Sequence, residues 1–347
     1  HRILGRTGLK VTVIGKGTFR TTEPAVMRYA LDQGINFLDT ARIYHDGNNE
    51  RWVGEAIQGI RDKVYLATKF VIEGKDGALL PKEEMMASVD KSLRELRTDY
   101  IDIMFLHHMS SVEQVMYEPA REVLVEAQKQ GKIRFLGVST HANEAVVLDA
   151  MVADAAKLYD AAMVQYNFKS DPAVKEAIAR AAKAGIGIVA MKTQVGGYET
   201  KELGEISPHQ AALKWVLQDP NVSTTVPSMV NLDQIKEDVA VMHMDFKLTR
   251  AESQILERYG KAIAPYYCLR CGQCEGTCPQ GVDIPTVNRC LMYAEGYRDL
   301  VVARQTYDTL MPRVSAAQCV ECSECNARCA NGLDIAAQMR RAQTFFC

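Results

Sequence analysis

Short apolar runs typical of β-strands alternate with amphipathic stretches typical of helices through the first 245 residues. Counting an opening strand at residues 11–15, the alternation gives eight strand–helix units, which is typical of a parallel barrel surrounded by helices. A doubly wound open sheet is the alternative, but its first strand usually leads into a longer glycine-rich loop than Gly15-Lys16-Gly17-Thr18. We therefore predict an α/β fold, a (β/α)8 TIM barrel.

The predicted elements follow one another at even spacing. The other seven strands are expected at residues 36–39, 64–68, 102–106, 135–138, 162–164, 186–190 and 224–226. The helices are expected at residues 24–33, 50–60, 82–96, 119–130, 143–153, 173–184, 208–218 and 232–242. Gly34, Gly131 and Gly185 each follow a predicted helix, where a left-handed residue commonly ends it.

All ten cysteines lie in the last 80 residues, and none precedes Cys268. Disulfide frameworks usually spread through a small secreted domain, whereas cysteines gathered in one tail are typical of metal binding. This change in composition predicts a barrel domain at 1–258 and a second domain at 259–347. Helical apolar spacing at residues 285–298 and 301–310 predicts that the second domain is mainly helical.

Eight of the cysteines form two copies of the spacing C-x-x-C-x-x-C-x-x-x-C, 51 positions apart. This spacing is typical of bacterial ferredoxins with two 4Fe–4S clusters, in which the fourth cysteine of each copy binds the other cluster. Zinc is the alternative, but zinc sites usually pair two neighbouring ligands with two distant ones. Cys290 and Cys347 fall outside the pattern. The predicted cluster ligands are Cys268, Cys271, Cys274 and Cys329 for one cluster, and Cys319, Cys322, Cys325 and Cys278 for the other.

Four proton-handling side chains follow consecutive predicted strands of the barrel. They are Asp39 and Tyr44 after the second strand, Lys69 at the end of the third and His107 at the end of the fourth. Because active sites of such barrels lie at the carboxyl ends of the strands, we expect these side chains to converge. A tyrosine keeps its proton up to pH about 10, but a neighbouring ammonium stabilises the phenolate, and a carboxylate holds that ammonium in place. The four residues therefore predict general-acid catalysis of carbonyl reduction, with hydride from a separate donor.

At these residues the sequence resembles the aldo-keto reductase family. The matching segments are Phe-Leu-Asp-Thr-Ala at 37–41 with Tyr44 and Asn49-Glu50, Ala-Thr-Lys at 67–69, Phe-Leu-His at 105–107, Gly-Val-Ser at 137–139 and Val-Gln-Tyr-Asn at 164–167. The resemblance covers residues 2–242 and implies a nicotinamide cofactor, a small carbonyl or alcohol substrate and Tyr44 as the acid. It also implies that Ser139 and Gln165 hold the nicotinamide carboxamide, with Thr140 where many members have asparagine.

The segment aligned with the family's adenosine site departs from the pattern of NADPH-preferring members. Those members have a lysine and an arginine at the positions of Ser228 and Gln234, where they hold the 2′-phosphate. A phosphate without a charged partner loses its strongest hydrogen bonds, so NADH is at least as suitable here as NADPH. Glu237 matches the same motif, Asp238 replaces an asparagine and adds a repulsive charge, and Lys192 is placed to meet the pyrophosphate.

The two parts together resemble the branch of aldo-keto reductases that carries a C-terminal 4Fe–4S domain. A hydride carries two electrons whereas a cluster moves one, and the sequence has no flavin motif to connect them. We therefore expect the clusters to serve a redox protein partner or to brace the barrel. The alternative function is an electron-transfer subunit of a larger redox complex, with the barrel as a scaffold.

Composition argues against other classes of partner. The formal net charge of −2 offers no basic surplus for nucleic acid, and the absence of an apolar run of about 18 residues predicts no transmembrane segment. We expect a cytoplasmic protein. Periplasmic export is the alternative, because some members of the resembled branch carry twin-arginine signals and the sequence begins at His1 rather than methionine.

Overall fold

The computed structural model describes residues 1–74, 77–199, 203–204, 206–322 and 324–347. The chain divides into two compact units. One comprises His1–Thr193 and Ala212–Leu248, and the other comprises Gln194–Ala211 and Thr249–Cys347. The strands of the predicted barrel lie in the first unit and the ten cysteines in the second.

Eight parallel strands form one sheet, in which each strand is hydrogen-bonded to the next along the chain. The sheet closes because residues 13–15 run beside the last strand: the Gly15 N–H donates to Thr225 O at 2.7 Å, and the Thr225 N–H donates to Val13 O at 3.0 Å. This closure confirms the predicted (β/α)8 barrel. The strands are β3 (Lys16–Gly17), β4 (Phe37–Asp39), β5 (Tyr65–Phe70), β6 (Ile101–Leu106), β7 (Ile133–Thr140), β8 (Ala161–Gln165), β9 (Gly187–Met191) and β10 (Val222–Thr225).

Side chains alternate between the two faces of the barrel wall. In β6, Ile103 and Phe105 pack with residues of other strands such as Phe37, whereas Met104 and Leu106 pack in the core shared with the helices. This alternation follows from the two-residue period of a strand. The barrel interior is therefore a filled core, and polar chemistry is confined to the ends of the strands.

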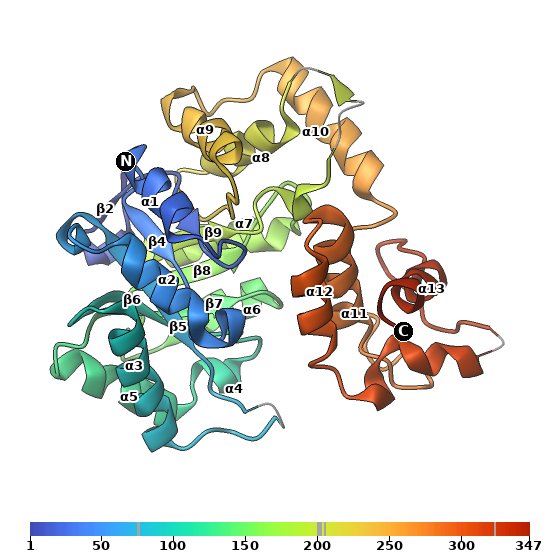
Figure 1. The fold of residues 1–347 in the computed structure, drawn as a ribbon, viewed down its shortest axis with the longest axis horizontal. Helices are drawn as coiled ribbons and strands as arrows, with labels where there is room; N and C mark the ends of the chain where they lie inside the picture. The colour runs from blue at the N-terminus through green and yellow to red at the C-terminus, as the bar shows by residue number, and fades with distance from the viewer. Residues whose placement is uncertain (75–76, 200–202, 205, 323) are drawn as a thin grey trace. The chain divides into compact units, whose positions relative to one another are not determined.

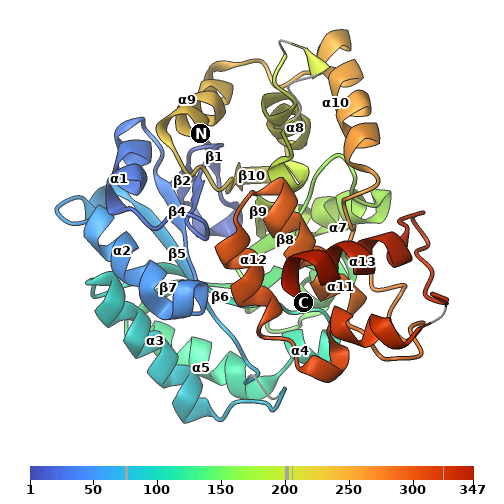
Figure 2. The ribbon, with the colours of Figure 1, turned by 45° about the vertical axis from the view of Figure 1, so that its right-hand side comes forward.

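The helices that follow the strands lie along the outside of the sheet (Figure 1). Figure 2 shows α1, α2, α3 and α5 on this outer face. Gly34, Gly131 and Gly185 adopt left-handed φ values of 96°, 73° and 85° after their helices. The helices are α1 (Pro24–Asp32), α2 (Asn48–Ala56), α3 (Lys82–Leu96), α4 (Val112–Val115), α5 (Glu118–Lys129), α6 (Glu144–Ala153), α7 (Pro172–Lys183), α8 (Pro208–Leu217) and α9 (Leu232–Ala240).

The bounds predicted for the opening strand, residues 11–15, are wrong, although residues 13–15 do run beside β10. The chain first forms an antiparallel hairpin of β1 (Arg2–Ile3) and β2 (Lys10–Val11), and the first barrel strand, β3, comes after it. The Thr12 N–H donates to the Asn36 side chain at 2.8 Å, outside the ladder of the hairpin. The apolar run therefore begins in β2 of the hairpin and continues to an isolated bridge between Ile14 and Thr225 of β10. Together these two features have the residue pattern of a single strand.

The cysteine-rich unit is mainly helical. Its helices are α10 (Arg250–Ile263), α11 (Ile284–Leu291), α12 (Leu300–Tyr307) and α13 (Ile335–Phe346). The predicted helix at 285–298 comprises α11 and a π-helical segment, Met292–Gly296, and the one at 301–310 corresponds to α12. α10 and α13 were not predicted. Among the described residues, no helix has the length and apolar character needed to cross a membrane.

Candidate functional site

Predicted catalytic side chains lie at the carboxyl ends of three neighbouring strands. Asp39 is the last residue of β4, and Lys69 is next to last in β5. In the register of the sheet Asp39 lies opposite Ala67, and Lys69 lies opposite Phe105. His107 directly follows β6. Because parallel strands end at the same rim, three separate sequence segments meet there.

Lys69 connects Asp39 to Tyr44, which begins a short 3-10 segment after β4. Its Nζ donates to Asp39 Oδ1 at 2.5 Å, to Thr40 O at 2.6 Å and to the Tyr44 hydroxyl at 3.4 Å. Asp39 and Lys69 are only 4% and 1% exposed. Burial raises the pKa of Asp39 and lowers the pKa of Lys69, while the attraction between the two charges opposes both shifts. An ammonium held by a carboxylate therefore lies beside the phenol oxygen.

Two rings flank the half-buried Tyr44. The Phe19 ring centroid lies 4.8 Å from that of Tyr44, and the His107 ring approaches edge-on with centroids 5.8 Å apart. Lys192 Nζ lies 5.9 Å from the Phe19 ring centroid, so the cation predicted for the pyrophosphate and Tyr44 are both neighbours of Phe19. Sequence reasoning missed Phe19, although its position just after the first strand marks it as a rim residue.

A second buried carboxylate supports the same rim. Glu50 is fully buried, accepts a hydrogen bond from Thr68 Oγ1 at 2.6 Å and forms an ion pair with Arg42. Burial raises the pKa of Glu50, and the Arg42 charge opposes the rise. Thr68 precedes Lys69 in β5, and the Glu50 charge also acts on Lys69. In the sequence Glu50 is only part of the matching Asn49-Glu50 segment, so its place beside the four predicted catalytic residues was not predicted.

The residues expected at the nicotinamide end lie on adjacent strands. Ser139 is in β7, Gln165 ends β8, and both are buried. Ser139 Oγ accepts the His108 N–H at 3.4 Å. The Thr140 hydroxyl donates to Ala142 O at 2.6 Å, so this side chain is engaged in its own loop.

The residues expected at the adenosine end lie after β10. Gln234 and Glu237 are on α9, and Ser228 lies in the loop before it. The Gln234 side-chain oxygen accepts the Val230 N–H at 2.9 Å, so this side chain stabilises the loop. A Cβ atom on Gly17 would lie 3.4 Å from Ser228 Oγ, which shows how closely the first strand passes this loop.

A buried lysine that the sequence did not single out lies behind the adenosine loop. Lys16 Nζ donates to Met229 O at 2.7 Å and to Thr21 Oγ1 at 2.6 Å. Burial lowers the pKa of Lys16 to about 7; the Asp238 charge opposes this shift and the Arg20 charge adds to it. Asp238, expected to repel a nucleotide, therefore acts on the Lys16 cation, which also feels the charge of Arg20.

Two of the predicted cluster cysteines, Cys268 and Cys319, each have the last cysteine of the other motif among their neighbouring thiols. Burial raises the pKa of Cys268 to about 11, and the thiols of Cys274 and Cys329 add to the rise. Asn331 also connects the two motifs, because its Nδ2 donates to Cys271 Sγ at 3.3 Å and its N–H donates to Cys329 Sγ at 3.4 Å.

Cys319 has the reciprocal neighbour. Burial raises the pKa of Cys319 to about 11, and Cys278 is the first of the neighbouring thiols that contribute, with Cys322 and Cys325. Cys347 contributes as well, so Cys319 has neighbouring thiols from both motifs and one from outside them. Residues of α11 and α13 form the apolar core beside them, against which several of these cysteines pack half-buried.

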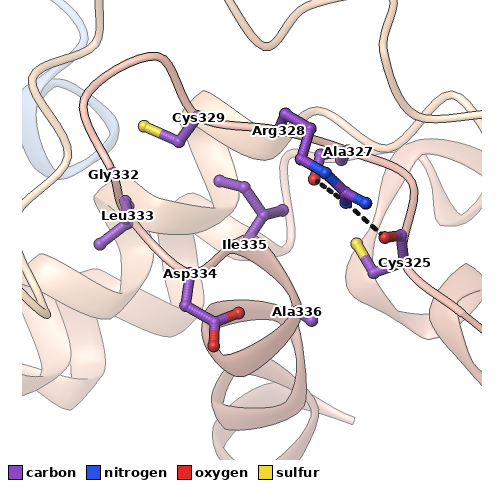
Figure 3. Close-up of a pocket in the computed structure, with 9 residues that line it drawn as sticks. All are labelled: Cys325, Ala327, Arg328, Cys329, Gly332, Leu333, Asp334, Ile335 and Ala336. Atoms are coloured by element: carbon purple, nitrogen blue, oxygen red, sulfur yellow. Dashed lines mark hydrogen bonds between the residues drawn. The ribbon is translucent and has the colours of Figure 1, made fainter.

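A cavity of about 270 Å³ separates two cysteines of the second motif. Figure 3 shows Cys325 and Cys329 on opposite sides of this cavity, with Ile335 at the start of α13 between them. The Arg328 guanidinium donates to Cys325 O at 2.6 Å and holds the intervening loop. The two thiols therefore line one cavity from opposite sides.

A closed parallel barrel with acid–base residues at its strand ends is the architecture of the barrel enzymes. The chain belongs to the aldo/keto reductase family, a family of oxidoreductases, whose family model matches residues 13–203 and 199–260. The matched segment ends before Cys268. The barrel and its rim residues therefore fall within the family's own region, and the cysteine-rich unit extends beyond it.

Named relatives resemble the barrel part of the chain. Methylglyoxal reductase DkgB of Salmonella typhi is 37% identical over 137 residues, which are 38% of this chain and 48% of that protein. The chain thus spans about half the length of the first curated relatives it matches. An aldo-keto reductase of Bacillus halodurans in its holo form is 26% identical with a TM-score of 0.62, over 74% of this chain and 95% of that one. An aldo-keto reductase of Klebsiella pneumoniae in complex with NADPH is 25% identical with a TM-score of 0.61, over 74% and 94% of the two chains.

Proposed function

We propose that this protein reduces a small carbonyl compound with a nicotinamide cofactor, using Tyr44 as the general acid. The observation that carries the proposal is the contact of Lys69 with both Asp39 and the Tyr44 hydroxyl. A positive charge beside a phenol stabilises the phenolate that remains when the proton leaves. Methylglyoxal is the test substrate of choice, because curated relatives are named methylglyoxal reductases.

The chain's own residues have distinct tasks in this reaction. The bound nicotinamide would supply the hydride to the carbonyl carbon. Tyr44 donates its proton to the carbonyl oxygen, Lys69 stabilises the phenolate, and Asp39 keeps the ammonium in place. His107, edge-on to Tyr44, orients the carbonyl oxygen towards the phenol. Ser139 and Gln165, on neighbouring strands, would hold the carboxamide of the nicotinamide.

The adenosine end supports a cofactor site without the usual 2′-phosphate cations. Ser228 and Gln234 are uncharged, and the Gln234 side chain already bonds the Val230 N–H. Lys16 is fully buried and its amino group donates to Met229 O, so it is directed into the protein and away from a 2′-phosphate. The NADPH complex of the Klebsiella pneumoniae relative makes NADPH one candidate, and the uncharged loop favours NADH as the other.

The cysteine-rich unit would hold two 4Fe–4S clusters, each capable of exchanging one electron. The support is the contact of Asn331 with Cys271 of the first motif and with Cys329 of the second, the two cysteines predicted to share one cluster. Zinc sites usually pair two neighbouring ligands with two distant ones, whereas each motif here runs four cysteines together, which favours the cluster over zinc. A redox protein partner would supply or remove the electrons.

The test of the reductase is Tyr44→Phe, with Tyr29→Phe in α1 as the matched control. We expect kcat for methylglyoxal to fall by about 10² to 10⁴ in Tyr44→Phe, because a general acid contributes that much. Reduced-nicotinamide fluorescence should show unchanged cofactor binding in both variants. Turnover of Tyr44→Phe at the level of Tyr29→Phe would contradict the assignment.

The test of the cluster proposal is the metal content of anaerobically purified protein. We expect about eight irons per chain, and about four in Cys329→Ser, because that substitution removes a ligand of one cluster. Cys347→Ser, outside both motifs, should keep the full iron content. Stoichiometric zinc without iron or sulfide in the unaltered protein would contradict the proposal.

A further inference from the structure

Three histidines meet at the rim beside Tyr44, although only one of them belongs to the predicted catalytic group. His107 and His108 follow β6, and His141 follows the adjacent strand β7. Their ring centroids lie 3.8 Å apart for His107 and His108, and 5.0 Å apart for His108 and His141. One ring nitrogen from each residue lies within 4.8 Å of the others.

The backbone at His108 accounts for this arrangement. Successive side chains of an extended chain point to opposite sides, so two consecutive histidines would ordinarily diverge. His108 has a φ of 68°, in the left-handed region that residues other than glycine rarely occupy. The Ser139 hydroxyl accepts the His108 N–H at 3.4 Å, and the Met109 N–H donates to Ser139 O at 2.9 Å. Strained conformations of this kind cluster at functional sites.

We infer that His107, His108 and His141 form a binding site for a divalent transition-metal ion such as Zn²⁺. Neutral imidazole is a preferred ligand of zinc, copper, iron and nickel. Three protein ligands leave a position open for water or substrate, as in zinc sites that exchange their fourth ligand. Coordination requires unprotonated imidazoles, so the affinity falls as the pH falls through the histidine range.

Zinc at this site should act on carbonyl reduction, a consequence that rests on the proposed function. His107 lies edge-on to Tyr44, and the carbonyl oxygen of a substrate has to approach between them. An ion on His107 occupies this space and removes the imidazole from the reaction. Zn²⁺ therefore inhibits carbonyl reduction in competition with the carbonyl substrate, raising the apparent KM and leaving kcat at saturating substrate unchanged.

The experiment measures zinc binding directly on the full chain. Anaerobic protein is dialysed against Zn²⁺, and zinc and iron are counted in the same samples, so that metal on vacant cysteines is recognised by missing iron. We expect one zinc per chain at full iron content, its loss in the double variant His108→Gln/His141→Gln, and at least about tenfold weaker binding in His141→Gln. His243→Gln, an exposed histidine outside the group, is the matched control and should bind as the unaltered chain does.

Two results would overturn the inference. The first is equal zinc content in the double variant and the unaltered chain at equal iron content, and the second is no zinc bound by the unaltered chain. Unchanged binding of reduced nicotinamide by the double variant shows that its barrel is folded. If zinc binds through these histidines but methylglyoxal is not reduced even without zinc, the proposed reductase fails while the metal site stands.

Discussion

The buried pair of Asp39 and Lys69 gives the sharpest prediction about the barrel. Lys69→Met removes the cation while the Asp39 side chain stays only 6% exposed, so a carboxylate is left without its charged partner. Breaking a buried pair in this way costs about 3–5 kcal/mol of unfolding free energy. Lys82→Met is the matched control, because its ion pair with Glu122 is nearly half exposed on both sides and is expected to contribute about 0–1 kcal/mol.

Urea unfolding followed by tryptophan fluorescence measures this loss in the right part of the chain. The protein has two tryptophans, Trp52 and Trp215, and both lie in the barrel unit. The double variant Asp39→Asn/Lys69→Met should lose less than the sum of the two single variants, because neither partner is then left as an isolated charge. The Lys69→Met penalty should also shrink in acid, where the carboxyl of Asp39 takes up a proton.

The sign of that pH effect follows from burial. Burial raises the pKa of Asp39 in the folded chain, and without Lys69 nothing comparable opposes the rise. The folded variant then binds more protons than the unfolded one just above the ordinary carboxyl pKa, so its stability falls as the pH rises through that window. A Lys69→Met loss equal to that of Lys82→Met, or simple additivity in the double variant, would refute the reasoning.

Two further predictions concern the adenosine loop. Burial lowers the pKa of Lys16 from 10.5 to about 7, so the unfolded chain holds one more proton between these values. Between pH 7 and 10.5, Lys16 should therefore make the free energy of unfolding rise by about 1.4 kcal/mol per pH unit. Urea unfolding of Lys16→Met at several pH values should lack this contribution. A free energy of unfolding that changes with pH in the same way in the variant and the unaltered chain would contradict the prediction. Ser228→Lys should tighten NADPH relative to NADH about tenfold or more, because a charge-assisted hydrogen bond contributes about 1.5–3 kcal/mol. Fluorescence titration of both cofactors measures the ratio, and a strong NADPH preference in the unaltered chain would contradict the reading of Ser228 and Gln234.

Most elements of the barrel could be predicted because the residue patterns that specify a helix or a helix end lie within the element itself. α3 begins and ends where the apolar spacing predicted, at Lys82–Leu96, and Gly131 ends α5 by a conformation that glycine adopts without strain. The error at residues 11–15 has the opposite cause. An apolar run can stay in one sheet or pass to another, and its distant hydrogen-bond partners decide which. Here the partners are Asn36 and Thr225, which the residues of the run do not specify.

The same distinction applies to the candidate site: contacts that follow from strand order could be predicted, and contacts that depend on packing could not. Asp39 and Lys69 could be placed together because strand order alone puts both on one rim. Glu50 could not, because its contact with Thr68 depends on how α2 packs against β5. The regrouping of Cys271 with Cys329, 58 positions apart, stays a prediction from the repeated spacing. The shared contact of both thiols with Asn331 depends on how the chain folds between them and could not be predicted.

The position of one histidine in the group follows from strand order, and the position of another depends on the backbone conformation. The order of β6 and β7 is enough to place His141 near His107, since neighbouring parallel strands end side by side. That order says nothing of His108, whose side chain would leave the rim in an extended backbone. Only the left-handed turn, stabilised by Ser139 from β7, brings the second imidazole back. Because Ser139 is also expected to hold the nicotinamide carboxamide, metal binding at the histidines and cofactor binding should influence each other through this one side chain.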